Sequence, residues 1–244
     1  MKKSKITSVR LTSILTNVII IAMLAIVAVT SFGGYNSIFA FSGDVDEPYY
    51  RGESTRNEVA LMINVYWGTE FIEPMLEVMK KYGVKCTFFV GGSWVDDNND
   101  LLKKIIDEGH EVGNHGYFHK DHKKLSLEGN LSEIKATNSL VYAVSGYNIR
   151  LFAPPSGSYG EATLKAAKSL DMTVIMWSKD TIDWRDKDSS LVYQRATKNV
   201  SAGDLILAHP TKHTLEALPK IFETYANLGL KAVTVGQIIQ KNNV

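Results

Sequence analysis

The sequence predicts an α/β fold: a distorted, incomplete (β/α) barrel of about seven parallel strands, in a single domain behind an amino-terminal membrane segment. Two observations indicate the domain. From residue 58 onward, short apolar and β-branched runs alternate with amphipathic stretches of helical length, and glycines follow several of those stretches. Such alternation is typical of parallel strands joined by right-handed crossovers. A third observation, a basic and then apolar amino terminus, indicates the membrane segment.

Residues 1–32 are predicted to be a signal peptide or a signal-anchor helix. Basic side chains within residues 1–10 precede an apolar run at 11–29, and no clean small-residue cleavage site follows. This favours an uncleaved anchor; cleavage would give a secreted protein. The first charges after the run are acidic, so the positive-inside rule places the domain outside the cytoplasm, at the cell membrane. Residues 33–57 are assigned to a linker.

The elements of the domain are assigned from periodicity and from their flanking turn residues. Short apolar runs predict strands at 59–65, 86–90, 111–114, 151–153, 173–177, 205–208 and 231–233. Amphipathic stretches predict helices at 71–82, 101–108, 127–145, 162–170, 190–200 and 215–228. A helix or an irregular crossover thus separates each pair of consecutive strands.

Composition excludes some classes of partner and bond. The 244 residues, 45% of them hydrophobic, suffice for one large core. A formal net charge of +1, without a basic stripe, argues against nucleic acid as a partner. Cys86 is the single cysteine and lies in an apolar run, so we expect a core thiol and no intrachain disulfide.

Two histidines four residues apart, His115 and His119, follow the third predicted strand. Imidazoles at this spacing can share one divalent ion, and the alternative is a pair of polar residues on a solvated loop. Their location favours the ion, because the carboxyl ends of parallel barrel strands form the active face. Other polar or aromatic residues also follow strand ends: Asn64, Trp67, Glu70, Ser156, Asp180, Asp183, Trp184 and His209. We therefore predict a metal site, with Zn²⁺ as the default ion and Co²⁺, Fe²⁺ or Ni²⁺ as compatible ones.

Five motifs, taken in order, resemble those of the polysaccharide deacetylases of carbohydrate esterase family 4, the NodB homology domain, and most closely its sporulation-associated branch. Residues 60–68 (ALMINVYWG) correspond to the family's TFDD-type strand end, and residues 114–119 (NHGYFH) correspond to its H-(S/T)-x-x-H motif. Residues 152–157 (FAPPSG) correspond to the R-x-P-(Y/S)-G wall motif. Residues 180–184 (DTIDW) correspond to the DxxDW motif, and residues 207–209 (LAH) to the L-x-H motif. The resemblance covers about residues 58–239 and implies that 58–240 is one such domain.

The resemblance implies metal-assisted removal of acetyl groups from N-acetylglucosamine or N-acetylmuramic acid units of a cell-wall polysaccharide of the peptidoglycan type. On that template His115 and His119 are metal ligands. His209 protonates the leaving amine, and Asp183 orients His209. The sugar cleft is shaped by Trp67, Trp184, Pro154, Pro155, Ser156 and Gly157. Two of these residues have structural alternatives, since Asp183 could cap a helix and Trp184 could lie in the core.

The departures from the family pattern fall on the residues that would accept a proton and complete the metal site. Asn64 stands where the family has its aspartate base, Val65 stands where it has a carboxylate ligand, and Ala153 stands where it has an arginine that pairs with the base. An amide does not accept a proton at neutral pH. The base and its cationic partner are absent together. This joint absence is physically consistent, because an arginine without its carboxylate would be an unpaired buried charge.

Two hypotheses follow from these departures. In the first, the chain is a weak or altered deacetylase in which Glu70, Asp121 or Asp180 supplies the base and the third ligand. In the second, it is a glycan-binding pseudoenzyme with a scaffold role in cell-wall or spore formation. Retention of both metal histidines, His209 and Asp183 favours the first hypothesis, and the loss of the carboxylate at Asn64 favours the second.

Overall fold

The computed structural model describes residues 46–240 and, nearer the amino terminus, residues 17, 18, 20, 21 and 23. The chain divides into two units, Met1–Gly43 and Asp44–Val244, and the second holds the domain. Most of the predicted membrane segment and the first part of the predicted linker lie outside the described residues. Within the described part of the chain, no helix has the length and apolar character needed to cross a membrane.

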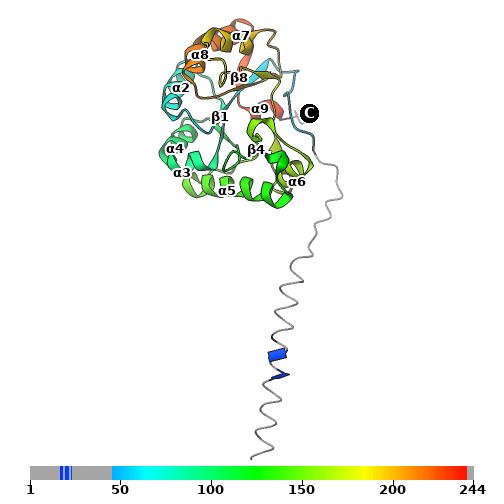
Figure 1. The fold of residues 1–244 in the computed structure, drawn as a ribbon. Helices are drawn as coiled ribbons and strands as arrows, with labels where there is room; N and C mark the ends of the chain where they lie inside the picture. Colours follow the sequence, from blue (N-terminus) through cyan, green and yellow to red (C-terminus); the bar gives the residue numbers. More distant parts are fainter. Residues whose placement is uncertain (1–16, 19, 22, 24–45, 241–244) are drawn as a thin grey trace, which may run out of the picture. The chain divides into compact units, whose positions relative to one another are not determined.

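The domain is built from parallel strands alternating with helices. The strands are β1 Glu58–Val65, β2 Thr87–Val90, β3 Glu111–Asn114, β4 Leu151–Phe152, β5 Thr173–Val174, β6 Lys179–Asp180, β7 Leu205–Ala208 and β8 Lys231–Val233. The helices are α2 Thr69–Lys81, α3 Gly92–Asp97, α4 Asn99–Asp107, α5 Leu127–Ser145, α6 Glu161–Ser169, α7 Ser189–Thr197, α8 Lys212–Asn227 and α9 Val235–Ile239, with 3-10 turns η1 His122–Lys124 and η2 Pro155–Gly157. In Figure 1 the larger helices surround the strands, with β1 at the centre.

Strand β1 organises the sheet. Seven strands follow the order β5-β4-β3-β2-β1-β7-β6, and β8 pairs with β1 as well. Every one of these pairings is parallel. Ala60 pairs with β7 and β8, whereas Met62 pairs with β7 and β2, so β8 and β2 share one edge of β1. Since β5 and β6 are the ends of the path, the sheet is an incomplete barrel, and this prediction is confirmed.

Side-chain alternation along β1 divides the core into two clusters. Ala60 and Met62 belong to an inner cluster that fills the barrel, together with Phe89 and Leu207. The alternate residues of β1, namely Val59, Leu61, Ile63 and Val65, belong to the larger outer cluster between the sheet and the helices. This period of two is the signature of a strand buried on both faces. Asn64 is the next alternate residue after Ala60 and Met62, so its side chain faces the barrel interior near the carboxyl end of β1.

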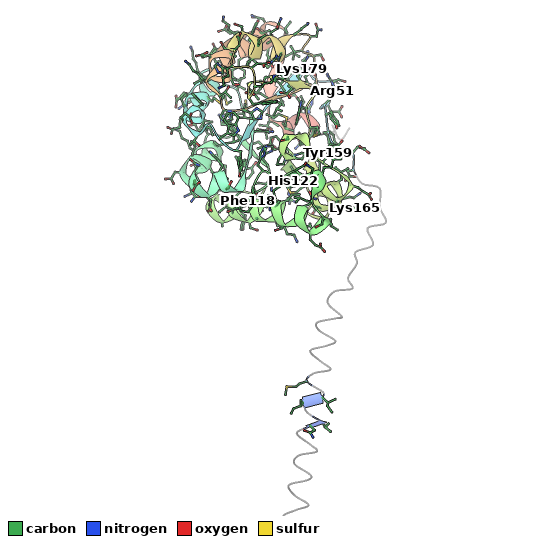
Figure 2. The ribbon with its side chains drawn as sticks, in the orientation of Figure 1. Arg51, Phe118, His122, Tyr159, Lys165 and Lys179 are labelled. Atoms are coloured by element: carbon green, nitrogen blue, oxygen red, sulfur yellow. The ribbon has the colours of Figure 1, made fainter. Side chains whose placement is uncertain are left out.

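The segment 46–53, which we call the strap, bridges the open side of the barrel. Tyr49 forms a bridge to Ile175 beside β5, and Arg51 forms a bridge to Asp204 at the start of β7. Asp204 is buried and forms an ion pair with Arg51. It also accepts hydrogen bonds from Ser178 Oγ (2.7 Å) and Ser201 N (2.8 Å). Figure 2 labels Arg51 and Lys179, two cations that approach Asp204. The predicted linker is therefore part of the packed domain from residue 46.

The elements differ from the predicted ones mainly where they are short. Strand β6 and helices α3 and α9 were not predicted, and β5 ends at Val174 rather than at residue 177. The chain leaves β5 early because Ile175 pairs with Tyr49 of the strap and Met176 N donates to the carbonyl of Tyr49. The seven predicted strands and six predicted helices otherwise coincide with elements of the structure.

Candidate active site

The carboxyl ends of the strands surround one cavity of about 520 Å³. Every strand from β1 to β7 except β2 has a residue of its end, or of the loop that follows, in the lining. The lining residues are Asn64, Tyr66, Trp67, His115, His119, Ser156, Trp177, Asp180, Trp184, Leu207 and His209. The convergence predicted from the sequence is thus present: residues up to 145 positions apart line the same cavity.

His115 and His119 lie side by side at the floor of this cavity. Their ring centroids are 5.1 Å apart. His115 is buried, and its Nδ1 lies 2.7 Å from the carbonyl oxygen of Ala153, which can only accept, so Nδ1 carries the proton and Nε2 is the available ligand atom. Burial, and next the neighbouring His119, lower the pKa of His115 to about 3, and burial also lowers the pKa of His119. Both rings are therefore neutral near pH 7, the state in which imidazole binds metal.

The turn between the two histidines depends on a glycine. Gly116 has a φ of +71°, and a Cβ at this position would lie 2.9 Å from Nε2 of the buried His122. Both facts exclude a side chain here without a shift of His122. This explains why Gly116 stands where the family motif has a hydroxyl residue, since His122 occupies the adjacent space.

A carboxylate from α5 holds the same turn in place. Glu133 Oε2 accepts hydrogen bonds from the backbone N–H groups of Tyr117 (2.9 Å) and Phe118 (2.8 Å), and Oε1 pairs with Lys120 at 2.9 Å. Burial opposes the charge on this carboxylate, but the hydrogen bonds from Phe118 and Lys120 outweigh it, so the pKa of Glu133 lies below its ordinary value. Glu133 was not identified from the sequence, because its position in α5 carries no motif.

His209, which lines the cavity, and the buried Asp183 form a second polar pair. His209 Nδ1 lies 2.7 Å from Asp183 Oδ1, and the backbone N–H of His209 donates to Oδ2 at 2.6 Å. The hydroxyl of Thr214 donates to the same Oδ2. Asp183 is buried and caps no helix, since α7 begins at the cap residue Asp188. The carboxylate thus fixes the ring of His209 and leaves Nε2 as the atom that can give or take a proton in the cavity.

Asn64, predicted to stand in place of a base, lies at the carboxyl end of β1. It lines the cavity, is 4% exposed, and its Oδ1 has no hydrogen-bond partner within the described residues. Val65 belongs to the outer cluster and does not line the cavity. Ala153 is buried in the inner cluster. In the described part of the chain, no three His, Cys, Asp or Glu side chains are placed to share one metal ion.

The three carboxylates proposed as substitutes for the base differ in their position relative to the cavity. Asp180 lines the cavity, and its Oδ1 accepts a hydrogen bond from Ile182 N at 2.8 Å. Glu70 and Asp121 are exposed and do not line the cavity, and Asp121 binds Ser158 and Lys124 instead. Asp180 is therefore the only one of the three that a molecule in the cavity can contact.

Aromatic rings form much of the cavity wall. Trp67 is 45% exposed and stacks on His209, with ring centroids 5.8 Å apart and planes within 7°. Trp184 is 54% exposed, so it is not a core residue. Tyr66 and Trp177 also line the cavity and were not among the predicted site residues, although each follows a predicted strand or ends one. Exposed aromatic faces converging on a cleft are suited to stacking on a sugar ring.

The predicted wall at residues 154–157 contributes one residue directly. Ser156 lines the cavity, whereas Pro154, Pro155 and Gly157 do not. Gly157 has a φ of +64°, and a Cβ there would lie 2.7 Å from the ring of Trp177. The glycine thus allows Trp177 to lie against the wall.

Comparison with known proteins identifies the family. The polysaccharide deacetylase family model matches residues 51–175, about half of the chain. The chain belongs to the polysaccharide deacetylase family. Members of this family are hydrolases that act on carbon–nitrogen bonds and are generally metal-dependent.

Relatives of this deacetylase-family chain include enzymes and a pseudoenzyme. It is 39% identical to the uncharacterised protein YlxY of Bacillus subtilis over 81% of this chain and 62% of that protein, and so spans less than two thirds of it. It is 30% identical to a peptidoglycan-N-acetylglucosamine deacetylase of Bacillus cereus over 83% of this chain and 72% of the enzyme.

A solved structure of a family 4 pseudoenzyme from Bacillus anthracis superposes with a TM-score of 0.77 at 38% identity, covering 80% of this chain and 69% of that one. A mutant of that pseudoenzyme with restored enzymatic activity superposes equally well, at 36% identity and over 80% and 71% of the two chains.

Proposed function

We propose that this chain is an impaired deacetylase: it binds a cell-wall polysaccharide of the peptidoglycan type and releases acetate far more slowly than family members with an aspartate base. One observation carries the proposal, namely that the cavity retains the proton-donating half of the chemistry and lacks the proton-accepting half. His209, Asp183 and Thr214 are hydrogen-bonded as a unit, whereas an amide stands at Asn64. A positioned general base contributes about 10² to 10⁴ in rate, which sets the scale of the loss.

The roles of the remaining residues follow from the cavity. The glycan stacks on Trp67 and Trp184, and its acetamide lies between the two histidines and His209. Water adds to the acetamide carbonyl carbon and loses a proton to solvent, because Asn64 cannot accept it. His209 Nε2 gives a proton to the nitrogen as the C–N bond breaks, acetate and the free amine leave, and Asp183 stabilises the protonated ring. A divalent metal, when bound, polarises the acetamide carbonyl and stabilises the oxyanion.

The residues present fit a metal only in part. The Nε2 atom of His115 and the ring of His119 are suited to Zn²⁺, and Co²⁺ or another first-row ion also binds imidazole. The carboxylate that would complete the set is replaced by Val65, which lies in the outer cluster. We therefore propose a zinc site of low affinity.

A second candidate function rests on Asp180. Because this carboxylate lines the cavity, it is positioned to act as an alternative base, which would make the chain a deacetylase with an altered mechanism. The experiment that separates the two candidates measures acetate release from peptidoglycan and from N-acetylglucosamine oligomers, with added Zn²⁺, for the parent and for Asp180→Asn. Binding of the same glycans with little acetate from either protein supports the impaired deacetylase. Acetate release at the rate of the Bacillus cereus relative, lost in Asp180→Asn, supports the second candidate instead.

We also propose that the amino terminus holds the domain at the outer side of the cell membrane, or directs its secretion if the segment is cleaved. The basic, apolar and then acidic order of residues 1–47 supports this proposal. In a bacterial host, the full chain should fractionate with membranes and be digested by protease added to spheroplasts. Intact protein in the cytosolic fraction would overturn it.

A further inference from the structure

The charge of the cavity points to a cationic occupant. Within the described residues, the lining contains no lysine or arginine, and Asp180 is its only carboxylate. The two nearby arginines, Arg185 of the following loop and Arg195 of α7, are engaged elsewhere: Arg185 binds Asp186 through Nε and Nη2 at 2.8 Å, and Arg195 binds Asp186 at 2.5 Å. The hydrogen bond that Asp180 receives comes from the backbone N–H of Ile182. Within the described residues Asp180 forms no ion pair, and Arg185, the cation whose pKa its charge helps to raise, is held by Asp186, so the carboxylate remains open to an occupant of the cavity.

Two further features suit the same occupant. Four aromatic side chains line the cavity, namely Tyr66, Trp67, Trp177 and Trp184. Aromatic faces attract cations as well as the apolar faces of sugars. The second feature is Asn64, whose Oδ1 is buried without a hydrogen-bond partner in the described part of the chain. A buried acceptor without a donor is costly, so a reversal of the amide that turns this oxygen to the cavity, where a bound N–H group donates to it, is favoured.

An acetamide and an amine make opposite demands on such a site. The carbonyl oxygen of an N-acetyl group needs a cation or a donor, and Val65 removes the carboxylate that would help to hold that cation. A de-N-acetylated amino sugar instead presents a protonated amine with three N–H donors, for which a carboxylate, an amide oxygen and aromatic faces are the fitting partners.

We propose that the cavity selects de-N-acetylated, cationic hexosamine units over N-acetylated ones, with Asp180 as the residue that recognises the ammonium group. This inference rests on the proposed function, since it takes the cavity to be a site for cell-wall polysaccharide, and it names which form of that polymer binds. The chain then binds glycans from which other enzymes have already removed acetyl groups.

The test compares two ligands of equal length. Calorimetric titration of the purified full-length chain, with EDTA present and at mildly acidic pH, measures binding of the β-1,4-linked tetramers of glucosamine and of N-acetylglucosamine. We expect the glucosamine tetramer to bind at least about tenfold tighter, which corresponds to about 1.4 kcal/mol. Equal or tighter binding of the N-acetylated tetramer overturns the inference but leaves the proposed function standing. Failure of both tetramers to bind overturns the proposed function.

Two variants assign the selectivity to a residue. Asp180→Asn removes the charge but keeps an oxygen that can accept the Ile182 hydrogen bond, so the loop should hold its shape, which circular dichroism and thermal melting verify. We expect this variant to lose the preference for the glucosamine tetramer. Glu70→Gln removes one charge outside the cavity and should keep the preference, which controls for non-specific attraction of a cationic oligomer. A preference retained in Asp180→Asn, or lost in Glu70→Gln, contradicts the assignment.

Discussion

At the scale of single residues, the proposed function depends on three positions. We propose that Asn64 stands in place of a base, Val65 in place of a metal ligand and Ala153 in place of the cation that would pair with the base. The structure explains their joint occurrence, because Ala153 is buried in the inner cluster. An arginine there, without a carboxylate beside it, would be a buried charge without a partner, which costs several kcal/mol. Loss of either member of the pair therefore favours loss of the other.

The first prediction concerns the base. Asn64→Asp should raise acetate release above that of the parent, because a carboxylate then lines the cavity where the amide stood. The gain should remain below about 10²-fold, since the new carboxylate lacks both its cationic partner and the third metal ligand. The double variant Asn64→Asp with Ala153→Arg should exceed the single one, because the guanidinium restores charge balance and orientation.

The measurement is acetate release from peptidoglycan at saturating Zn²⁺, with Asn64→Ser as a matched variant that changes the residue without supplying a carboxylate. Parent activity that falls in Asn64→Asp would mean that another base is in use. Asp180→Asn, alone and in the Asn64→Asp background, would then show whether Asp180 is that base.

The second prediction concerns the two imidazoles. The parent should bind one Zn²⁺ per chain, more weakly than a site with two histidines and a carboxylate, because Val65 offers no ligand atom. The variant with both His115→Ala and His119→Ala should lose this binding. Elemental analysis and titration with a chromogenic chelator measure both proteins, and His213→Ala, at a half-buried histidine outside the cavity, is the control. Equal zinc binding by the double variant and the parent would place the metal elsewhere.

At the scale of elements, the turn that carries the histidines is held by its neighbours. Glu133 of α5 accepts two backbone N–H groups of the turn, Asn114 Oδ1 accepts the N–H of Gly116 at 2.7 Å, and the N–H of Gly92 in α3 donates to the carbonyl of Gly116 at 2.9 Å. Both α3 and α5 thus fix the backbone from which His115 and His119 project. The precision of this site depends on helices that contribute no residue to the cavity lining.

The third prediction follows from this arrangement. Glu133→Ala should lower the free energy of unfolding by about 2 kcal/mol, because two part-buried backbone N–H groups lose a charged acceptor. Glu133→Gln keeps one acceptor oxygen and should cost about half as much. Both variants should bind Zn²⁺ more weakly, in the same order. Urea unfolding gives the free energies, and Lys135→Gln, an exposed change on the same helix, should stay within about 0.5 kcal/mol of the parent. A Glu133→Ala variant as stable as the parent would show that water replaces the carboxylate.

The elements also show how far the sequence alone could predict this molecule. The helices and the longer strands have a period that a single sequence displays, and the residues that follow strand ends could be placed on one face. Strand β6 has two residues and no period, and α3 begins at Gly91 and Gly92, which usually mark a turn. Glu133 and Trp177 act through contacts with residues 15 to 20 positions away, such as Tyr117 and Gly157. Such contacts depend on tertiary packing, which no local pattern records.

At the scale of the whole molecule, the strap and the central strand determine how the barrel is closed. The seven-strand path leaves β5 and β6 as open ends, and the strap joins Ile175 beside β5 to Asp204 at β7. Its backbone hydrogen bonds join residues 49–53 to Val174, Met176, Gly203 and Ile238, and none of these residues lines the cavity. The residues that pair the strap with the barrel and the residues that line the cavity are thus different sets, so variants at Asn64 and Ala153 should keep the fold.

The last prediction concerns the pH dependence of this fold. His110 precedes β3 in the core, where its Nδ1 accepts the N–H of Cys86 at 3.1 Å and its ring meets Phe88 edge-on. Burial, and next the charge of Lys85, lower the pKa of His110 to about 4. The unfolded chain binds a proton at this histidine near pH 6.5, whereas the folded chain does not until about pH 4. The stability from neutral His110 is therefore complete above pH 6.5 and is lost as the pH falls toward 4, by at most about 3 kcal/mol.

The variant that tests this is His110→Asn, which keeps an acceptor for the Cys86 N–H but does not titrate in this range. Urea unfolding of both proteins at several pH values between 6.5 and 4 should show a steeper loss in the parent. Parallel curves would mean that His110 is protonated in the fold as readily as in the unfolded chain.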